Sequence, residues 1–311
     1  MIRFSKLSSS AGVGALILMS GAAHAQEAPP STAGPAFTFE GKIGAEYNSN
    51  VAVQELDANT GQGDWAATLN ARADVSGAPM DKLKLSAGYE FSQTLHDEFD
   101  AFDITLHRLY GDASYDFSGV TAGVMVNLAQ ANLDGDKYLT FTQVSPYVSH
   151  QFGDGLFVRV AYAATDKSFD GRPTRDAKSD AISGDAYFFL NGTKQYVAVG
   201  GKATKEDAND NTLDYDAGSA RVRYLQRFPA FDRELTFRAG VEYEKRDYDA
   251  PTPSIGAPRS DKRSGVDFSL EAPINDTLFV EASYRYGDYQ SNLASADYNE
   301  QVTSAKLGVK F

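Results

Sequence analysis

Charged residues in the second half of this sequence alternate with apolar residues at a spacing of two. In RELTFRAGVEYEKR, Arg238, Glu242 and Arg246 fall on one face of an extended strand, and Leu235 and Val241 fall on the other. Charges spaced in this way can form ion pairs across neighbouring strands. They can also create a field across a water-filled pore that selects solutes. The spacing alone leaves both interpretations open.

The candidate pore-lining residues share this alternating placement. A basic side chain facing lipid at the bilayer midplane costs about 2–4 kcal/mol, so these groups need water or an ionic partner. The candidates are Arg72, Arg108, Arg159, Lys194, Lys202, Arg221, Arg223, Arg227, Arg238, Glu242, Glu244, Arg246, Asp267, Glu271, Glu281 and Arg285.

Catalytic and metal-binding patterns are not found. Past the N-terminal segment, the histidines are His96, His107 and His150 on separate segments, and the chain has no cysteine, Gly-x-Ser-x-Gly or zinc-ligand spacing. The stretch DANDNT begins like a calcium loop but lacks its glycine and its bidentate glutamate. We therefore expect neither an enzyme nor a metal or cofactor. The formal net charge of −13 disfavours nucleic acid as a partner.

Period-two alternation recurs along the chain, as in KLKLSAGYEF, and indicates β-strands rather than helices. Each segment has about ten residues or more, the length of a tilted strand that crosses a bilayer. Fourteen such segments are predicted, near residues 36–47, 64–76, 82–94, 103–117, 119–130, 139–152, 155–166, 179–190, 193–205, 213–227, 233–247, 263–273, 276–288 and 301–311.

The connectors between these segments alternate in length. Short ones such as DFSG, FGDG and NGT alternate with longer polar ones such as HDEFDAFD and KSFDGRPTRDAK. This asymmetry is typical of bacterial outer-membrane barrels, with short periplasmic turns and longer outer loops. The predicted fold is an all-β, antiparallel, up-and-down transmembrane barrel. The alternative is a soluble β-sandwich. The acidic outer loops are solvated tips, sites for divalent cations that also bridge lipopolysaccharide, or charges that repel anions at the mouth.

The N-terminus has the pattern of a secretory signal. Arg3 and Lys6 precede an apolar run, and Ala23-His24-Ala25 has the form of a cleavage site. We expect residues 1–25 to be a cleaved signal peptide, residues 26–35 a flexible periplasmic tail, and residues 36–311 the barrel in the outer membrane.

The C-terminal strand ends on an aromatic residue. Leu307, Val309 and Phe311 share its apolar face, which we expect to close the barrel against the first strand and to face lipid. The ending resembles the C-terminal signature by which outer-membrane proteins recruit the barrel-assembly machinery.

The start of the predicted barrel, GKIGAEYNSNVAVQ, contains the Tyr-x-x-Asn-Val turn of residues 47–51. This turn, the fourteen strands and SPYVSHQFGDGLFVRVAY resemble the barrel domain of surface lipoprotein assembly modifiers. Putative proteobacterial porins share the turn. The resemblance covers nearly all of residues 36–311 and implies a role in lipoprotein export, although full members carry a helical repeat domain that this chain has no room for.

Three functions follow from these patterns. The first is a porin-like channel for small hydrophilic solutes. The second is an export barrel for a lipoprotein cargo, working with a periplasmic partner. The third is a structural or surface-binding barrel with a closed lumen. All three place the protein among outer-membrane lipid and lipopolysaccharide.

Overall fold

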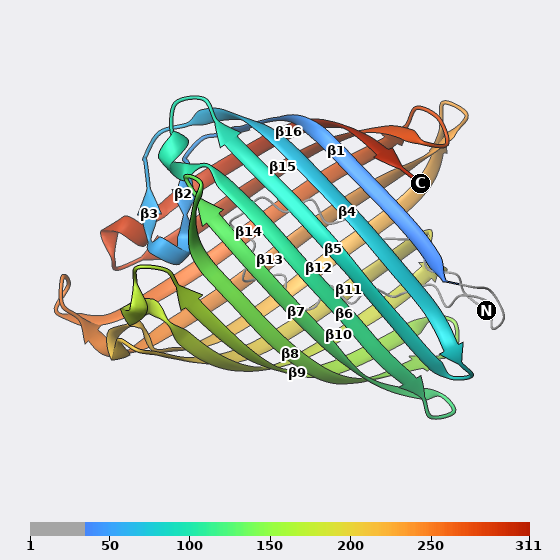
Figure 1. Cartoon of the computed structure of the whole chain (residues 1–311), viewed down its shortest axis with the longest axis horizontal. Coiled ribbons are helices and arrows are strands. Elements are labelled where there is room, and N and C mark those ends of the chain that lie inside the picture. The colour runs from blue at the N-terminus through green and yellow to red at the C-terminus, as the bar shows by residue number, and fades with distance from the viewer. Residues whose placement is uncertain (1–34) are drawn as a thin grey trace.

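Fourteen strands form one closed antiparallel barrel in the computed structural model, which describes residues 35–311 (Figure 1). Each strand pairs with the next along the chain, and the last pairs with the first, so the predicted up-and-down barrel is confirmed. The barrel strands are β1 (Ala36–Asn48), β4 (Asp64–Met80), β5 (Leu83–His96), β6 (Ile104–Asp116), β7 (Val120–Leu133), β8 (Asp136–Phe152), β9 (Leu156–Phe169), β10 (Ala177–Asn191), β11 (Gln195–Ala208), β12 (Tyr215–Ala230), β13 (Arg233–Thr252), β14 (Ala257–Pro273), β15 (Leu278–Ser291) and β16 (Tyr298–Lys310).

The strands are longer than a membrane requires. They contain 13 to 20 residues, whereas about 9–11 tilted residues cross a bilayer. The extra length lies partly in a segment predicted to be a loop: β13 and β14 stay paired, past an irregularity after Asp247, up to Thr252 and Ala257. The predicted outer loop over 248–262 is therefore mostly a hairpin.

The barrel closes where β1 meets β16. Their register runs from Glu40 opposite Lys310 to Asn48 opposite Val302. The amide of Phe311 donates to the carbonyl of Phe39 over 2.9 Å, and the amide of Phe39 donates back over 3.2 Å. Closure leaves neither strand with a free edge, which hydrocarbon would not tolerate.

The two faces of the wall differ in chemistry. Large apolar side chains such as Ile43, Val160 and Ile182 are more than half exposed on the outside. Charged side chains alternate with them and point inward, where Lys42 and Glu281 are almost fully buried. An apolar exterior around a charged interior is the arrangement that a lipid environment favours. Among residues 35–311, no helix is long and apolar enough to cross a membrane.

Three inward aromatic rings lie flat against glycines on the neighbouring strand. Tyr110 lies over Gly88, Tyr147 over Gly123 and Phe279 over Gly308, and each pair is directly opposite in register. A Cβ atom on any of these glycines would overlap the ring. The glycines therefore let large rings line the wall without projecting across the lumen.

One connector differs from the others. Residues 49–63, which we call the mouth loop, join β1 to β4 and contain β2 (Ala52–Val53), the 3₁₀ turn η2 (Gln54–Leu56) and β3 (Ala58–Asn59). Figure 1 shows β2 and β3 at the end of the barrel opposite the C-terminus. The register at the seam places the start of β1 beside the end of β16, at the end with the short turns.

The predicted signal peptide, residues 1–25, lies outside the described residues. So does the predicted tail, residues 26–35, except for Pro35.

Candidate functional site

Many inward charges are paired between strands that are adjacent or one strand apart. The guanidinium of Arg221 on β12 donates to Asp185 on β10 over 2.5 Å. Arg238 on β13 reaches Glu271 on β14 over 3.2 Å, and Arg285 on β15 reaches Glu300 on β16 over the same distance. These ion pairs join separate strands, as the wall-bracing interpretation requires.

Other pairs form along a single strand. Arg246 donates to Glu244 over 2.6 Å, and Arg72 donates to Asp74 over 2.9 Å. Residues two apart on a strand share a face, so the sequence spacing alone places these partners together.

The strand register puts nearly all the predicted lining residues on the inner face. Lys194 differs, because it lies in the turn between β10 and β11, where its exposed side chain pairs with Glu234 over 3.0 Å. The others lie on β4 (Arg72), β6 (Arg108), β9 (Arg159), β11 (Lys202), β12 (Arg221, Arg223, Arg227), β13 (Arg238, Glu242, Glu244, Arg246), β14 (Asp267, Glu271) and β15 (Glu281, Arg285).

Some lumenal charges have no ionic partner. Within residues 35–311, the guanidinium groups of Arg223 and Arg227 and the carboxylate of Glu242 make no ion pair within 4 Å. Arg159 instead lies over the ring of Tyr147, 4.0 Å from its centroid. A hollow of about 480 Å³, counting space open to solvent, is lined by Lys202, Arg221, Glu242, Glu244, Arg263 and Tyr289, among others.

The mouth loop is anchored to one side of the barrel by apolar contacts. Val53 belongs to a buried cluster with Ile104, Leu139 and Phe169, which are inward residues of β6, β8 and β9. Val51 is also buried, with 1% of its surface exposed. Burying each valine side chain contributes about 1.5–3 kcal/mol, so the loop is held in the mouth and does not extend into solvent.

Polar contacts hold the mouth loop to the other side. The Asp57 carboxylate accepts from Arg259 at the start of β14 over 2.8 Å and from Arg175 over 3.0 Å. Arg175 ends the 3₁₀ turn η4 (Pro173–Arg175) between β9 and β10, and it also donates to the carbonyl of Glu55 over 2.7 Å. Gln54 donates to the Tyr289 hydroxyl over 2.6 Å. The loop therefore crosses the mouth from wall to wall.

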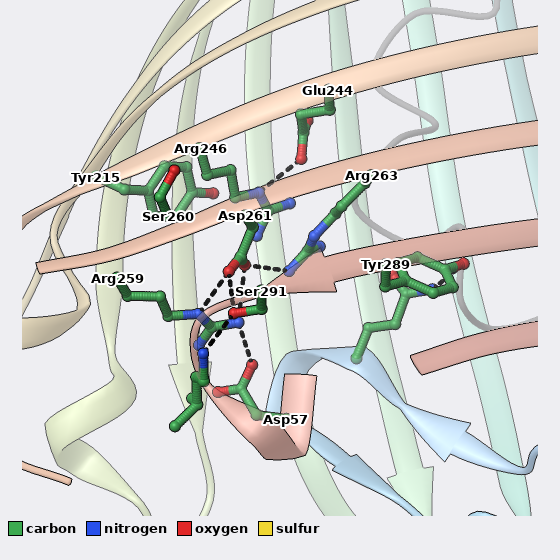
Figure 2. A network of polar contacts seen from close by, with 12 residues as sticks. Asp57, Tyr215, Glu244, Arg246, Arg259, Ser260, Asp261, Arg263, Tyr289 and Ser291 are labelled. Carbon is green, nitrogen blue, oxygen red and sulfur yellow. Dashed lines mark hydrogen bonds and ion pairs between the residues drawn. The ribbon is translucent and has the colours of Figure 1, made fainter. Parts of the chain in front are cut away.

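Asp261 organises the wall side of this contact. It accepts two hydrogen bonds from Arg259, both over 2.8 Å, one from Ser291 over 2.7 Å and one from Arg263 over 3.3 Å. Figure 2 shows Arg259 between Asp261 and Asp57, with Arg263 on the other side of Asp261. Two parallel hydrogen bonds fix the plane of the Arg259 guanidinium.

The two carboxylates of the mouth loop titrate differently. Burial raises the pKa of Glu55, although its own backbone and the positive charges of Lys167, Arg263 and Arg246 oppose the increase. Burial acts in the same direction on Asp57, but hydrogen bonds and charges from Arg259 and Arg175 outweigh it and lower the pKa of Asp57. Asp57 therefore stays charged at pH values at which Glu55 is already protonated.

The sequence did not identify Asp57, Arg175 or Arg259 as site residues. Two signals were present. Arg259, Asp261 and Arg263 alternate at period two into the start of the predicted strand at 263–273. The apolar residues Val51 and Val53 stand in a mostly polar connector. Neither signal tells which distant residue completes the contact.

A sealed barrel with an apolar exterior and a charged lumen defines an outer-membrane β-barrel protein. The family model for surface lipoprotein assembly modifiers matches residues 87–311, so the chain belongs to that family. This confirms the resemblance found in the sequence. The mouth loop lies outside the matched residues.

Solved structures with the same fold include outer-membrane proteins. Outer-membrane expressed OmpT of Vibrio cholerae is 14% identical with a TM-score of 0.52, covering 90% of this chain and 99% of that one. An anion-selective porin from Comamonas acidovorans is 9% identical with a TM-score of 0.51, covering 89% of this chain and 99% of that one. At these identities the likeness concerns the fold. A search of curated proteins found no match.

Proposed function

We propose that the protein forms an aqueous conduit across the outer membrane for small hydrophilic solutes, with the mouth loop narrowing its outer end. The observation that carries the proposal is the charged hollow inside the barrel, where Arg221, Glu242 and Arg263 lie along one cavity. Charges of both signs around open space favour water and polar solutes over a dry packed core.

The arginines without an ion pair support a role in selecting solutes, beside the role of the paired charges in bracing the wall. Arg223 and Arg227 on β12 are not neutralised by an ion pair within the described barrel, unlike Arg221 beside Asp185. Their field acts across the lumen and favours anions on this side.

Conductance measures the proposal directly. The full-length protein, refolded in detergent and inserted into planar bilayers, is expected to give discrete current steps in KCl. Folding of the inserted protein is verified by heat-modifiable gel mobility. The absence of current steps at every voltage would contradict the conduit and would leave a structural or surface-binding barrel with a closed lumen.

A second candidate function rests on family membership. The match to surface lipoprotein assembly modifiers favours a role in placing lipoproteins on the cell surface, with recruitment supplied by a separate periplasmic partner. Deleting the gene and exposing intact cells to protease tests this role. Loss of surface lipoproteins in the mutant supports it, whereas unchanged surface display contradicts it.

A further inference from the structure

At the outer mouth, two arginines donate hydrogen bonds to the Asp57 carboxylate. Oδ1 of Asp57 accepts from Nη2 of Arg259 over 2.8 Å, and Oδ2 accepts from Nη2 of Arg175 over 3.0 Å. Each carboxylate oxygen thus has its own guanidinium, although the three residues come from β14, η4 and the mouth loop. We call Arg175 and Arg259 the arginine cradle.

Arg259 is held in place by contacts other than those to Asp57. Arg259 is 3% exposed, makes two hydrogen bonds to Asp261 and lies over the Tyr248 ring, 4.7 Å from its centroid. Its guanidinium therefore presents the remaining N–H groups in a fixed direction. Arg175 lies on a connecting segment with a quarter of its side chain exposed, so it can adjust to what the cradle holds.

Asp57 reaches the cradle from the tip of the mouth loop, where Arg175 also donates to the carbonyl of Glu55. Asp57 directly follows η2 with φ of 52°, in the left-handed region that non-glycine residues seldom adopt. The apolar contacts of the mouth loop are made by Val51, Val53 and Leu56 on the preceding residues. Val51 and Val53 keep the base of the loop packed, so displacing Asp57 moves the tip alone. That movement also breaks the hydrogen bonds from Arg175 to the Glu55 carbonyl and from Gln54 to Tyr289.

We propose that the arginine cradle is a binding site for the carboxylate group of anionic solutes, and that Asp57 is a tethered occupant which such a solute displaces. The inference rests on the proposed conduit and names the solute class that it admits. A carboxylate fits because the present occupant is one, with both oxygens engaged by charge-assisted hydrogen bonds. Displacement frees the tip of the mouth loop and widens the outer end.

The test removes the tethered occupant and measures binding of acetate. Asp57→Gly suits the left-handed backbone and empties the cradle. In calorimetric titrations of the full chain in detergent, at constant ionic strength with chloride as the balancing anion, acetate should bind Asp57→Gly at least about tenfold more tightly than the parent protein. The difference arises because a tethered group competes at a high effective concentration.

Matched variants assign the gain to the cradle. Asp134→Gly removes another exposed aspartate of an outer turn with positive φ and should leave acetate binding as in the parent. Arg175→Gln in the Asp57→Gly background, which changes a connecting segment and not the wall, should abolish the gain. Arg259→Gln should do the same.

Each outcome decides the proposal. Equal acetate affinity in the parent protein and Asp57→Gly overturns it, as does a gain that survives both arginine changes. Inorganic phosphate that binds Asp57→Gly as tightly as acetate overturns the carboxylate class. If Asp57→Gly gains acetate binding but no variant conducts in bilayers, the cradle stands and the conduit fails. If the protein conducts without that gain, the cradle alone fails.

Discussion

At the scale of single residues, Glu55 makes the mouth loop sensitive to pH. Its pKa is raised by burial in the seated loop, so the seated state binds a proton more strongly than a state in which Glu55 is solvated. As pH falls through this raised pKa, which lies above the usual 4.5, protonation therefore stabilises the seated loop. Asp57 does not oppose this, because its lowered pKa keeps it charged until the pH falls below its usual value of 3.8.

We expect channel currents to decrease between pH 7.5 and pH 4.5, the usual pKa of a glutamate, measured as open probability in planar bilayers. Glu55→Gln imitates the protonated form, so this variant should show the low acidic level of current at both pH values. Currents that rise on acidification, or an unchanged pH dependence in Glu55→Gln, would contradict the role of Glu55.

Arg223 tests whether the lumenal charges select ions. Replacing Arg221 and Arg223 together by glutamate should shift the reversal potential in a KCl gradient toward cation selectivity. Arg223→Glu alone should give most of the shift, because Arg221 is already neutralised by Asp185 at 2.5 Å. Lys194→Glu makes the same charge change in an exposed turn and serves as the control. Unaltered reversal potentials would leave these charges with the wall-bracing role only.

At the scale of elements, the turn between β12 and β13 is made of unfavourable residues. Phe231 and Asp232 have φ of 53° and 58°, as in a type I′ turn, and Phe231 is 94% exposed. A left-handed conformation costs an ordinary residue about 1–2 kcal/mol, and Asn-Gly is the preferred pair for this turn.

Phe231→Asn combined with Asp232→Gly should therefore stabilise the folded barrel by about 1–2 kcal/mol. The measurement is the urea midpoint of unfolding in detergent, followed by heat-modifiable mobility. Gly192→Ala, at a glycine with φ of 52° in the preceding short turn, should have the opposite sign. A midpoint unaffected by the double change would show that the turn is not a source of strain.

The elements also show why the fold was predictable and the mouth was not. Alternation is local, and lipid outside the barrel forces the apolar face of each strand outward, so segments such as 82–94 and 276–288 correspond to β5 and β15. The mouth loop packs against Ile104 and Phe169. These are apolar residues on the inner faces of their strands, where the alternation predicts polar residues. The charges of the lumen were recognisable in the same way. Their pairing, such as Arg221 with Asp185, depends on a register between distant strands that the sequence does not state.

At the scale of the whole molecule, the seam between β1 and β16 depends on the last residue. Phe311 makes two backbone hydrogen bonds with Phe39, and their rings stack with centroids 6.3 Å apart. Deleting Phe311 should slow insertion and lower the folded fraction, measured by heat-modifiable mobility during refolding into lipid vesicles. Phe152→Ala removes another exposed aromatic ring without touching the seam and is the matched control. Equal folding rates for the deletion and the control would contradict this role.

The mouth loop is tied to the same seam. Asn50 donates to the carbonyl of Asn299, and Asn59 donates to the carbonyl of Ser295, both in the final hairpin of the chain. These partners lie more than 230 residues after the mouth loop in the chain, so the loop can make these contacts only when the final hairpin is in place. We therefore expect the mouth loop to take its place at the step in which β1 pairs with β16. If the barrel is the proposed conduit, its constriction is then in place as soon as the wall closes.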